Sequence, residues 1–137
     1  PNTRALDELY TVGPITVRST CSHHLLLMLG AAWIGVIPGD TLIGLSKFHR
    51  LADWVMSRPQ IQEEAAVQLA DEIERLIQPK GLAVVVKAGH LCMTWRGVRD
   101  TGTQMVTSIM RGALRDNVAA RAEFMAAIGG QGYAAAA

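Results

Sequence analysis

The sequence predicts an α+β domain: a four-stranded antiparallel sheet with two helices between its second and third strands. Three observations predict this fold class. The chain has 137 residues, half of them apolar, which suits one domain with one core. Short runs rich in Val, Ile and Thr are bounded by Gly and Pro, as strands are. One long segment repeats apolar side chains at helical spacing.

The first two strands are expected over residues 14–19 and 30–38. In the first, Ile15 and Val17 alternate with polar residues, which is typical of a strand with one buried face. The second is rich in strand formers and ends at a Pro-Gly-Asp turn. Residues 1–13 are expected to be an irregular extension.

Two helices follow. Ser46 is a suitable N-cap for a helix that ends near Ser57, and Pro59 suits the first position of the next helix. The first helix should bury Phe48, Leu51, Ala52 and Val55. The second should bury Ile61, Ala65, Leu69, Ile73 and Leu76, with charged residues covering its other face.

The remaining elements are a strand over residues 82–87, a strand or hairpin over 93–98 and 103–109, and a helix over 116–128. The domain thus spans residues 14–128, and 129–137 should form a flexible tail. We expect the helices on one face of the sheet. The other face and the sheet edges then need cover, which favours a closed or oligomeric sheet.

Composition excludes several classes of protein. The formal charge is +1, with no block of Lys or Arg, so nucleic acid is not an expected partner. The densest apolar run, residues 25–29, is too short to span a membrane. The first ten residues lack the apolar core of a signal peptide, which favours a reducing, cytoplasmic location.

Both cysteines have histidine neighbours, in Cys21-Ser22-His23-His24 and in His90-Leu91-Cys92. Thiolate and imidazole are preferred ligands of zinc, so these segments predict a metal site. A buried thiol or a Cys21–Cys92 disulfide is the alternative, and a reducing compartment disfavours the disulfide. Spacing leaves the ligands open: an extended segment pairs Cys21 with His23, whereas a turn pairs it with His24.

Three further features are weak when taken singly. Lys47 and Arg50 lie on one face near a helix N-terminus, where anions bind, although taken alone a solvated cationic turn is the better explanation. Gln62 and Glu63 lie in the first turn of the second helix, where an acidic side chain is common because it interacts favourably with the helix dipole. Arg96 follows the second cysteine by four residues and by itself is one more surface arginine.

Together these segments resemble the GTP cyclohydrolase I family, from about residue 15 to residue 128. The matching pieces, in order, are Cys21-Ser22-His23-His24, Ile43-Gly44-Leu45-Ser46-Lys47, Arg50, Arg58-Pro59-Gln60-Ile61-Gln62-Glu63, His90-Leu91-Cys92, Arg96-Gly97 and Thr107-Ser108. The resemblance implies the tunnelling fold, in which sheets of several subunits close into a barrel, as a pentameric ring or a stacked decamer. It also implies zinc-dependent hydrolysis of GTP at C8, release of formate and rearrangement to 7,8-dihydroneopterin triphosphate.

The resemblance further implies roles for individual residues. The zinc ligands would be Cys21, His24 and Cys92, and the proton-transfer residues His23 and His90. Ser46 would lie near the ribose step. The triphosphate clamp would be Lys47, Arg50 and Arg96, and the guanine-binding pair Gln62 and Glu63.

The chain departs from the family pattern at Ser22, where an acid is usual, at Leu27, where proline is common, and at Ala31, where a basic residue is common. It also resembles a short form, because relatives carry a long helical region before the first strand. Two other functions stay open: a tunnelling-fold relative that acts on another purine or pterin, and a ring-forming structural or regulatory homologue with an impaired site.

Overall fold

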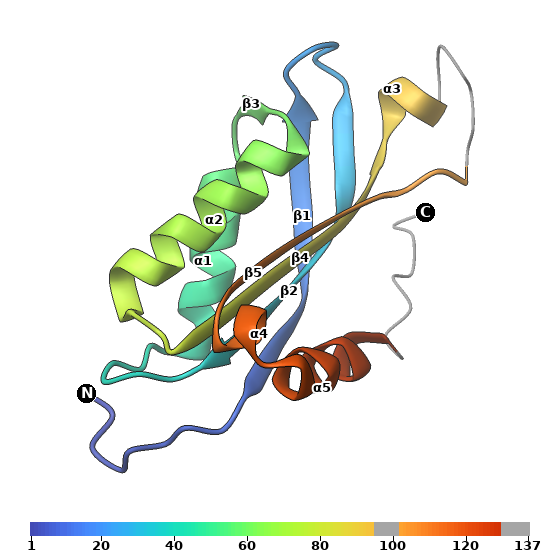
Figure 1. Ribbon diagram of the computed structural model, residues 1–137. Coiled ribbons are helices and arrows are strands. Elements are labelled where there is room, and N and C mark those ends of the chain that lie inside the picture. Colours follow the sequence, from blue (N-terminus) through green and yellow to red (C-terminus); the bar gives the residue numbers. More distant parts are fainter. Residues whose placement is uncertain (95–101, 130–137) are drawn as a thin grey trace.

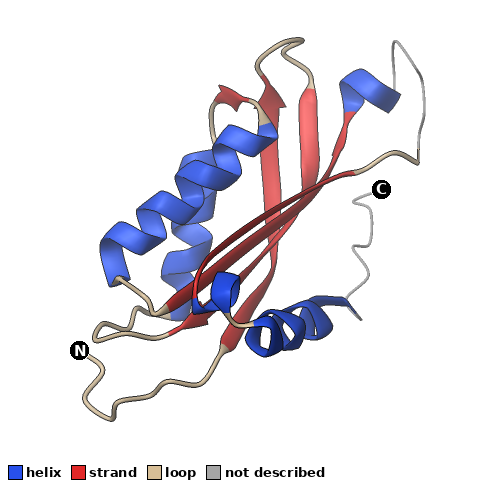
Figure 2. Cartoon of the chain, in the orientation of Figure 1, coloured by secondary structure: helices blue, strands red, loops and turns tan. Residues whose placement is uncertain are grey.

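The structure is a computed structural model that describes residues 1–94 and 102–129 (Figure 1). A twisted sheet forms its centre, with helices on both sides (Figure 2). The elements, in order, are β1 Tyr10–Cys21, β2 Leu27–Ile37, α1 Leu45–Met56, β3 Pro59–Gln60, α2 Gln62–Ile77, β4 Gly81–His90, α3 Leu91–Thr94, β5 Met105–Gly112, α4 Ala113–Asp116 and α5 Val118–Gly129. Within the two described ranges, no helix is long and apolar enough to cross a bilayer.

The sheet has the strand order β3-β1-β2-β4-β5. β1, β2, β4 and β5 pair antiparallel, and α1 and α2 lie between the second and third of them in sequence. The predicted α+β class is therefore confirmed. The sheet also contains a short additional strand, β3, which was not expected. It pairs parallel with the end of β1 through Thr20↔Pro59 and Cys21↔Gln60. Pro59 thus lies in an edge strand, where its missing N–H costs no ladder hydrogen bond, and does not begin a helix.

α1 and α2 cover one face of the sheet and form the larger core with it. Of the side chains predicted to face inward from α1, Phe48, Ala52 and Val55 are buried and Leu51 is partly buried. The residue that caps the N-terminus of α1 is Gly44, with extended backbone and no side-chain cap. Ser46 therefore lies inside the first turn, and its prediction as N-cap is wrong.

α2 buries Ala65, Leu69 and Ile73 as predicted, but its last inward residue is Ile77. Leu76, which was predicted to face inward, is 44% exposed. The buried stripe continues in steps of four from Leu69 to Ile73 to Ile77, which leaves Leu76 on the side turned to solvent.

The second face of the sheet is covered in part by α5, which corrects the prediction that the helices share one face. Phe124 and Ile128, four residues apart on α5, pack in a second core against Trp33 of β2 and Val85 of β4. Asn117 caps α5, because its side-chain oxygen accepts hydrogen bonds from the main-chain nitrogens of residues 119 and 120. The chain therefore turns beneath the sheet after β5.

Other boundaries also differ from the predictions. β1 begins at Tyr10, four residues before the predicted start, with a register shift between Val12 and Ile15. Thr94 lies in the short helix α3, so the strand predicted over residues 93–98 is wrong at its start; residues 95–98 lie outside the described part of the chain. The flexible tail was predicted for residues 129–137, but Gly129 is the last residue of α5. Residues 130–137 lie outside the described part of the chain.

Gly35 provides a test of the packing between α5 and the sheet. A Cβ atom added there would lie 2.4 Å from Cδ1 of Phe124, so Gly35→Ala should displace α5 and lower the free energy of unfolding by about 1–3 kcal/mol. Chemical denaturation measures this change. Gly89→Ala is the matched control in a neighbouring strand, because its Cβ would have only one neighbour, at 4.0 Å. Equal stability of the two variants would mean that Phe124 does not pack on Gly35.

Candidate functional site

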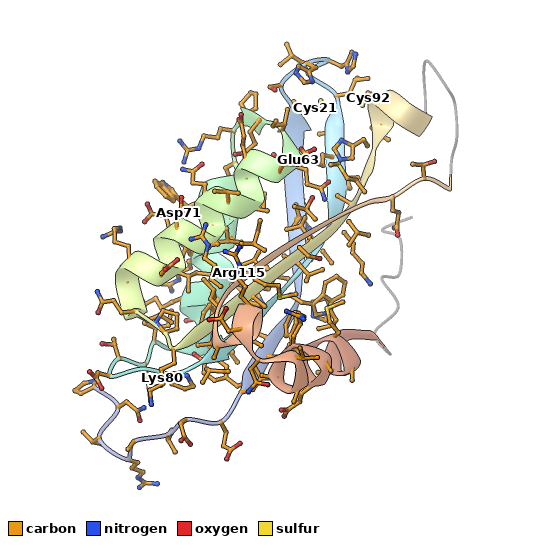
Figure 3. All side chains as sticks on the ribbon, in the orientation of Figure 1. Cys21, Glu63, Asp71, Lys80, Cys92 and Arg115 are labelled. Carbon is orange, nitrogen blue, oxygen red and sulfur yellow. The ribbon has the colours of Figure 1, made fainter. Side chains whose placement is uncertain are left out.

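The pairing of three strands brings the two cysteine segments together. Met28 of β2 pairs with Ser19 of β1 on one side and with His90 of β4 on the other. The end of β1 and the end of β4 therefore lie at the same end of the sheet. Figure 3 shows Cys21, Cys92 and, on α2, Glu63 gathered there.

Cys21, His24 and Cys92 form a group that fits a metal ion. Their candidate ligand atoms all lie within 4.8 Å of one another. The segment after Cys21 is a turn, closed by a hydrogen bond from the Leu25 nitrogen to the Cys21 carbonyl (2.8 Å), so His24 and not His23 lies with the thiols. Two thiols and an imidazole suit zinc, and three protein ligands leave a fourth position open, as catalytic zinc sites do. The cysteines are not joined by a disulfide.

A pocket of about 480 Å³ surrounds this group. Its lining combines the cysteine and histidine segments with the start of α2 and the segment before β5. The lining residues are Cys21, His23, His24, Ile61, Gln62, Glu63, His90, Cys92, Thr103, Gln104 and Met105. Seven predicted site residues thus meet in one cavity.

Gln62 connects the start of α2 to the sheet. Its side chain is buried, and its amide nitrogen lies 3.1 Å from the Val86 carbonyl, 3.0 Å from the Met105 carbonyl and 3.2 Å from the Thr107 hydroxyl. Its amide oxygen lies 2.8 Å from Nε2 of His90. The side chain is therefore directed into the protein.

Glu63 and the two pocket histidines outside the Cys-His-Cys group, His23 and His90, have different surroundings. Burial lowers the pKa of His90, and the nearby Glu63 carboxylate opposes this by favouring the charged ring. Glu63 itself is exposed, in the first turn of α2. His23 is also exposed, and its ring centre lies 6.4 Å from that of His24. These side chains can reach a molecule in the pocket.

The described members of the predicted anion clamp do not join this pocket within one chain. Ser46, Lys47 and Arg50 are exposed in the first two turns of α1. The other end of α1 is the one near the pocket, because the Arg58 carbonyl after it accepts a hydrogen bond from Ser19 of β1. At about 1.5 Å per residue, Ser46 lies about 15 Å back along the helix from that end. Arg96 lies outside the described residues.

Sequence reasoning missed the pocket residues before β5. Thr103, Gln104 and Met105 line the pocket because β5 pairs with β4, where Met105 lies opposite Ala88. This register between β4 and β5 places them beside His90, and it cannot be predicted from the local sequence of either strand. Thr107 belongs to a motif that matches the family, but the sequence predicted no role for it. In the structure its hydroxyl accepts a hydrogen bond from the side-chain amide of Gln62.

The three departures from the family pattern lie outside the pocket lining. Ser22 has an exposed side chain in the turn, and its main-chain nitrogen donates to the Gln60 carbonyl (3.2 Å). Leu27 begins β2 and is 49% exposed. Ala31 is buried in the second core. None of the described residues that line the pocket is therefore one of these three departures.

The fold places the chain in a structural class. The crystal structure of the archaeosine synthase QueF-Like in the apo form is similar, with a TM-score of 0.61, over 78% of this chain and 94% of that one. The sequence identity is 17%, so the likeness concerns the fold alone. The chain is a tunnelling-fold protein with a Cys-His-Cys group at one end of its sheet.

Sequence comparison identifies the family. Residues 2–129 match the profile described as GTP cyclohydrolase I. GTP cyclohydrolase 1 of Mycobacterium tuberculosis (strain H37Ra) is 47% identical over 119 residues, 85% of this chain and 59% of that protein. The enzyme of the same name from Deinococcus radiodurans is 44% identical over 124 residues, 90% of this chain and 57% of that protein. The chain belongs to the GTP cyclohydrolase I family, and it spans somewhat more than half the length of these relatives.

Proposed function

We propose that this chain hydrolyses GTP at C8 in a zinc-dependent reaction, releases formate and forms 7,8-dihydroneopterin triphosphate. The observation that carries this proposal is the meeting, in one pocket, of a Cys-His-Cys group with two further histidines and Glu63. The family and its relatives named GTP cyclohydrolase 1 support the same reaction.

Cys21, His24 and Cys92 would hold the zinc ion. Bound there, zinc would supply Lewis acidity and a hydrolytic nucleophile at neutral pH. Cys21 is buried and Cys92 is partly buried, whereas His24 is exposed on the turn. Cys21 at the end of β1 and Cys92 in α3 would hold the ion, and His24 would complete the set from the turn.

Glu63 would recognise the base. Guanine presents N1–H and the 2-amino group side by side, and both are donors. A carboxylate accepts only, so it can take both hydrogen bonds at once. The resemblance pairs Gln62 with Glu63 in this task, but of the two only Glu63 has an exposed side chain.

His23 and His90 would transfer protons during ring opening and the loss of formate. Histidine suits this work because its pKa lies near neutral pH. His23 reaches the pocket from the turn beside His24, and His90 from the end of β4. They therefore approach a bound purine from different elements.

The triphosphate clamp would come from a second copy of the chain. Lys47 and Arg50, with Ser46 for the ribose step, lie at the far end of α1 from the pocket of their own chain, and Arg96 would complete the clamp. A homo-oligomeric ring, a pentamer or a stacked decamer, would bring one chain's α1 to its neighbour's pocket. A monomer in light scattering that turns over GTP would exclude this arrangement.

The first test is conversion of GTP by the purified zinc-loaded chain. We expect equal molar amounts of formate and of neopterin, the latter measured by its fluorescence after oxidation. Guanine recognition predicts discrimination against ATP by roughly 10⁴-fold, since adenine lacks both donors and would leave Glu63 unpaired. Binding of GTP without formate release would instead support an impaired regulatory homologue, and conversion of another purine or pterin would support a relative with a different substrate.

Removal of one thiol tests the metal centre. Cys92→Ser should lose most of its zinc after dialysis, because a serine hydroxyl is not ionised at neutral pH and two ligands remain. Metal analysis measures about one zinc per chain in the wild type under this proposal. Ser22→Ala is the control on the same turn, since its side chain is exposed and outside the pocket lining. Full zinc occupancy in Cys92→Ser would remove Cys92 from the ligand set.

Glu63→Gln tests base recognition. The amide presents a donor where guanine also presents a donor, so GTP affinity should fall by about 100-fold or more, given about 1.5–3 kcal/mol for each hydrogen bond to a charged group. Zinc content and fold should not change. Glu64→Gln is the matched control, because Glu64 is exposed in the same helical turn and has the same relation to the helix dipole. Equal GTP affinities in nucleotide titrations of the two variants would contradict the role of Glu63.

A further inference from the structure

The orientation of the Gln62 carboxamide follows from its neighbours. The Val86 and Met105 carbonyls lie 3.1 and 3.0 Å from one of its two terminal atoms. A main-chain carbonyl only accepts hydrogen bonds, so the atom that faces two of them must be the amide nitrogen, with its two donors. The alternative, flipped amide would place its oxygen against the two carbonyl oxygens with no hydrogen between them, and among the contacts of the described residues only the Thr107 hydroxyl could then donate to it.

This orientation decides the tautomer of His90. The other terminal atom of Gln62 is then its oxygen, 2.8 Å from Nε2 of His90. An amide oxygen only accepts, so Nε2 must carry the proton. In the neutral ring, Nδ1 is left as the nitrogen with the free lone pair.

The same contacts leave Gln62 little to offer a substrate. Its side chain is 1% exposed, both amide hydrogens have acceptors within the sheet, and the oxygen faces His90. The residue joins α2, β4 and β5, three elements that are themselves packed together, so its rotamer is fixed by the fold. A partner held in this way fixes both the tautomer and the direction of a histidine ring.

We propose that Gln62 is a positioning residue that holds His90 as the Nε2–H tautomer, so that Nδ1 is the atom that exchanges protons in the pocket. The resemblance to the family assigned Gln62 to the purine base, and this proposal gives the recognition of the base to Glu63 alone of the pair. The importance of Nδ1 for turnover rests on the proposed function, whereas the hydrogen bond and the tautomer do not.

The tautomer is read directly by NMR. Long-range ¹H–¹⁵N correlation spectra of the zinc-loaded, ¹⁵N-labelled chain distinguish a protonated from an unprotonated ring nitrogen, and the signals missing from His90→Gln identify His90. Well above the usual histidine pKa of about 6.5, we expect Nε2 protonated and Nδ1 bare. A proton on Nδ1, or an even mixture of tautomers, would overturn the proposal even if no variant of Gln62 folds.

Gln62→Met tests the consequence for turnover, because methionine has similar length but neither accepts from Nε2 nor donates to the carbonyls. We expect mixed tautomers and a fall in kcat of about 10–100-fold, by analogy with the partners that orient metal-ligating histidines, with KM for GTP changed by less than about threefold. Gln60→Met is the matched control: Gln60 is also buried, but its amide donates to the Val55 carbonyl (2.7 Å). It should lose stability and keep both the tautomer and kcat.

The outcomes separate the two proposals. A raised KM with unchanged kcat in Gln62→Met would mean that Gln62 binds the purine, which overturns the positioning role. An unchanged tautomer with unchanged kcat would overturn it as well. A wild type that turns over no GTP would remove the proposed function, and the spectrum would still decide the tautomer.

Discussion

The central strand β2 pairs along its length with β1 on one side and β4 on the other, and this register holds the site together. It sets Cys21 and His90 at the same end of the sheet and on the same face, where α2 begins. Because side chains alternate between faces, a slip of one residue between β2 and β4 would turn His90 away from Gln62 and move Val84 and Val86 out of the core. The same apolar side chains that hold the fold thus fix the geometry of the polar groups.

α2 depends on this register and completes the site. Its buried face anchors it on the sheet, and Gln62 at its start is held by carbonyls of β4 and β5. On its exposed side, Arg111 of β5 pairs with Asp71 (2.6 Å) and Glu74 (2.7 Å). Such exposed pairs contribute about 0–1 kcal/mol each, so the apolar packing and not the ion pairs determines where the helix sits. Glu63 reaches the pocket as a result.

Several surfaces of the single chain are suited to contact with other chains. Leu25 on the turn is 69% exposed, and Val106 on the outer strand β5 is 55% exposed. Exposed apolar side chains near a strand edge favour association. The distance between the clamp residues on α1 and the pocket leads to the same expectation, because under the proposed function a triphosphate at the pocket of one chain would take cations from the α1 of another. The proposed ring therefore rests on two separate observations, one about packing and one about the site.

The sequence by itself determined the types of the main elements, the Cys-His segments and, through the ordered motifs, the family. These are local properties, read from spacing within a few residues of the chain. It did not determine that His24 and not His23 lies with the thiols, that Gln62 faces His90, that α5 covers the second face, or that residues 103–105 line the pocket. Each of these depends on a turn closed by a main-chain hydrogen bond, or on pairing and packing between segments far apart in the chain. Only the tertiary structure decides them, because the free energy that selects them comes from contacts that no local pattern encodes.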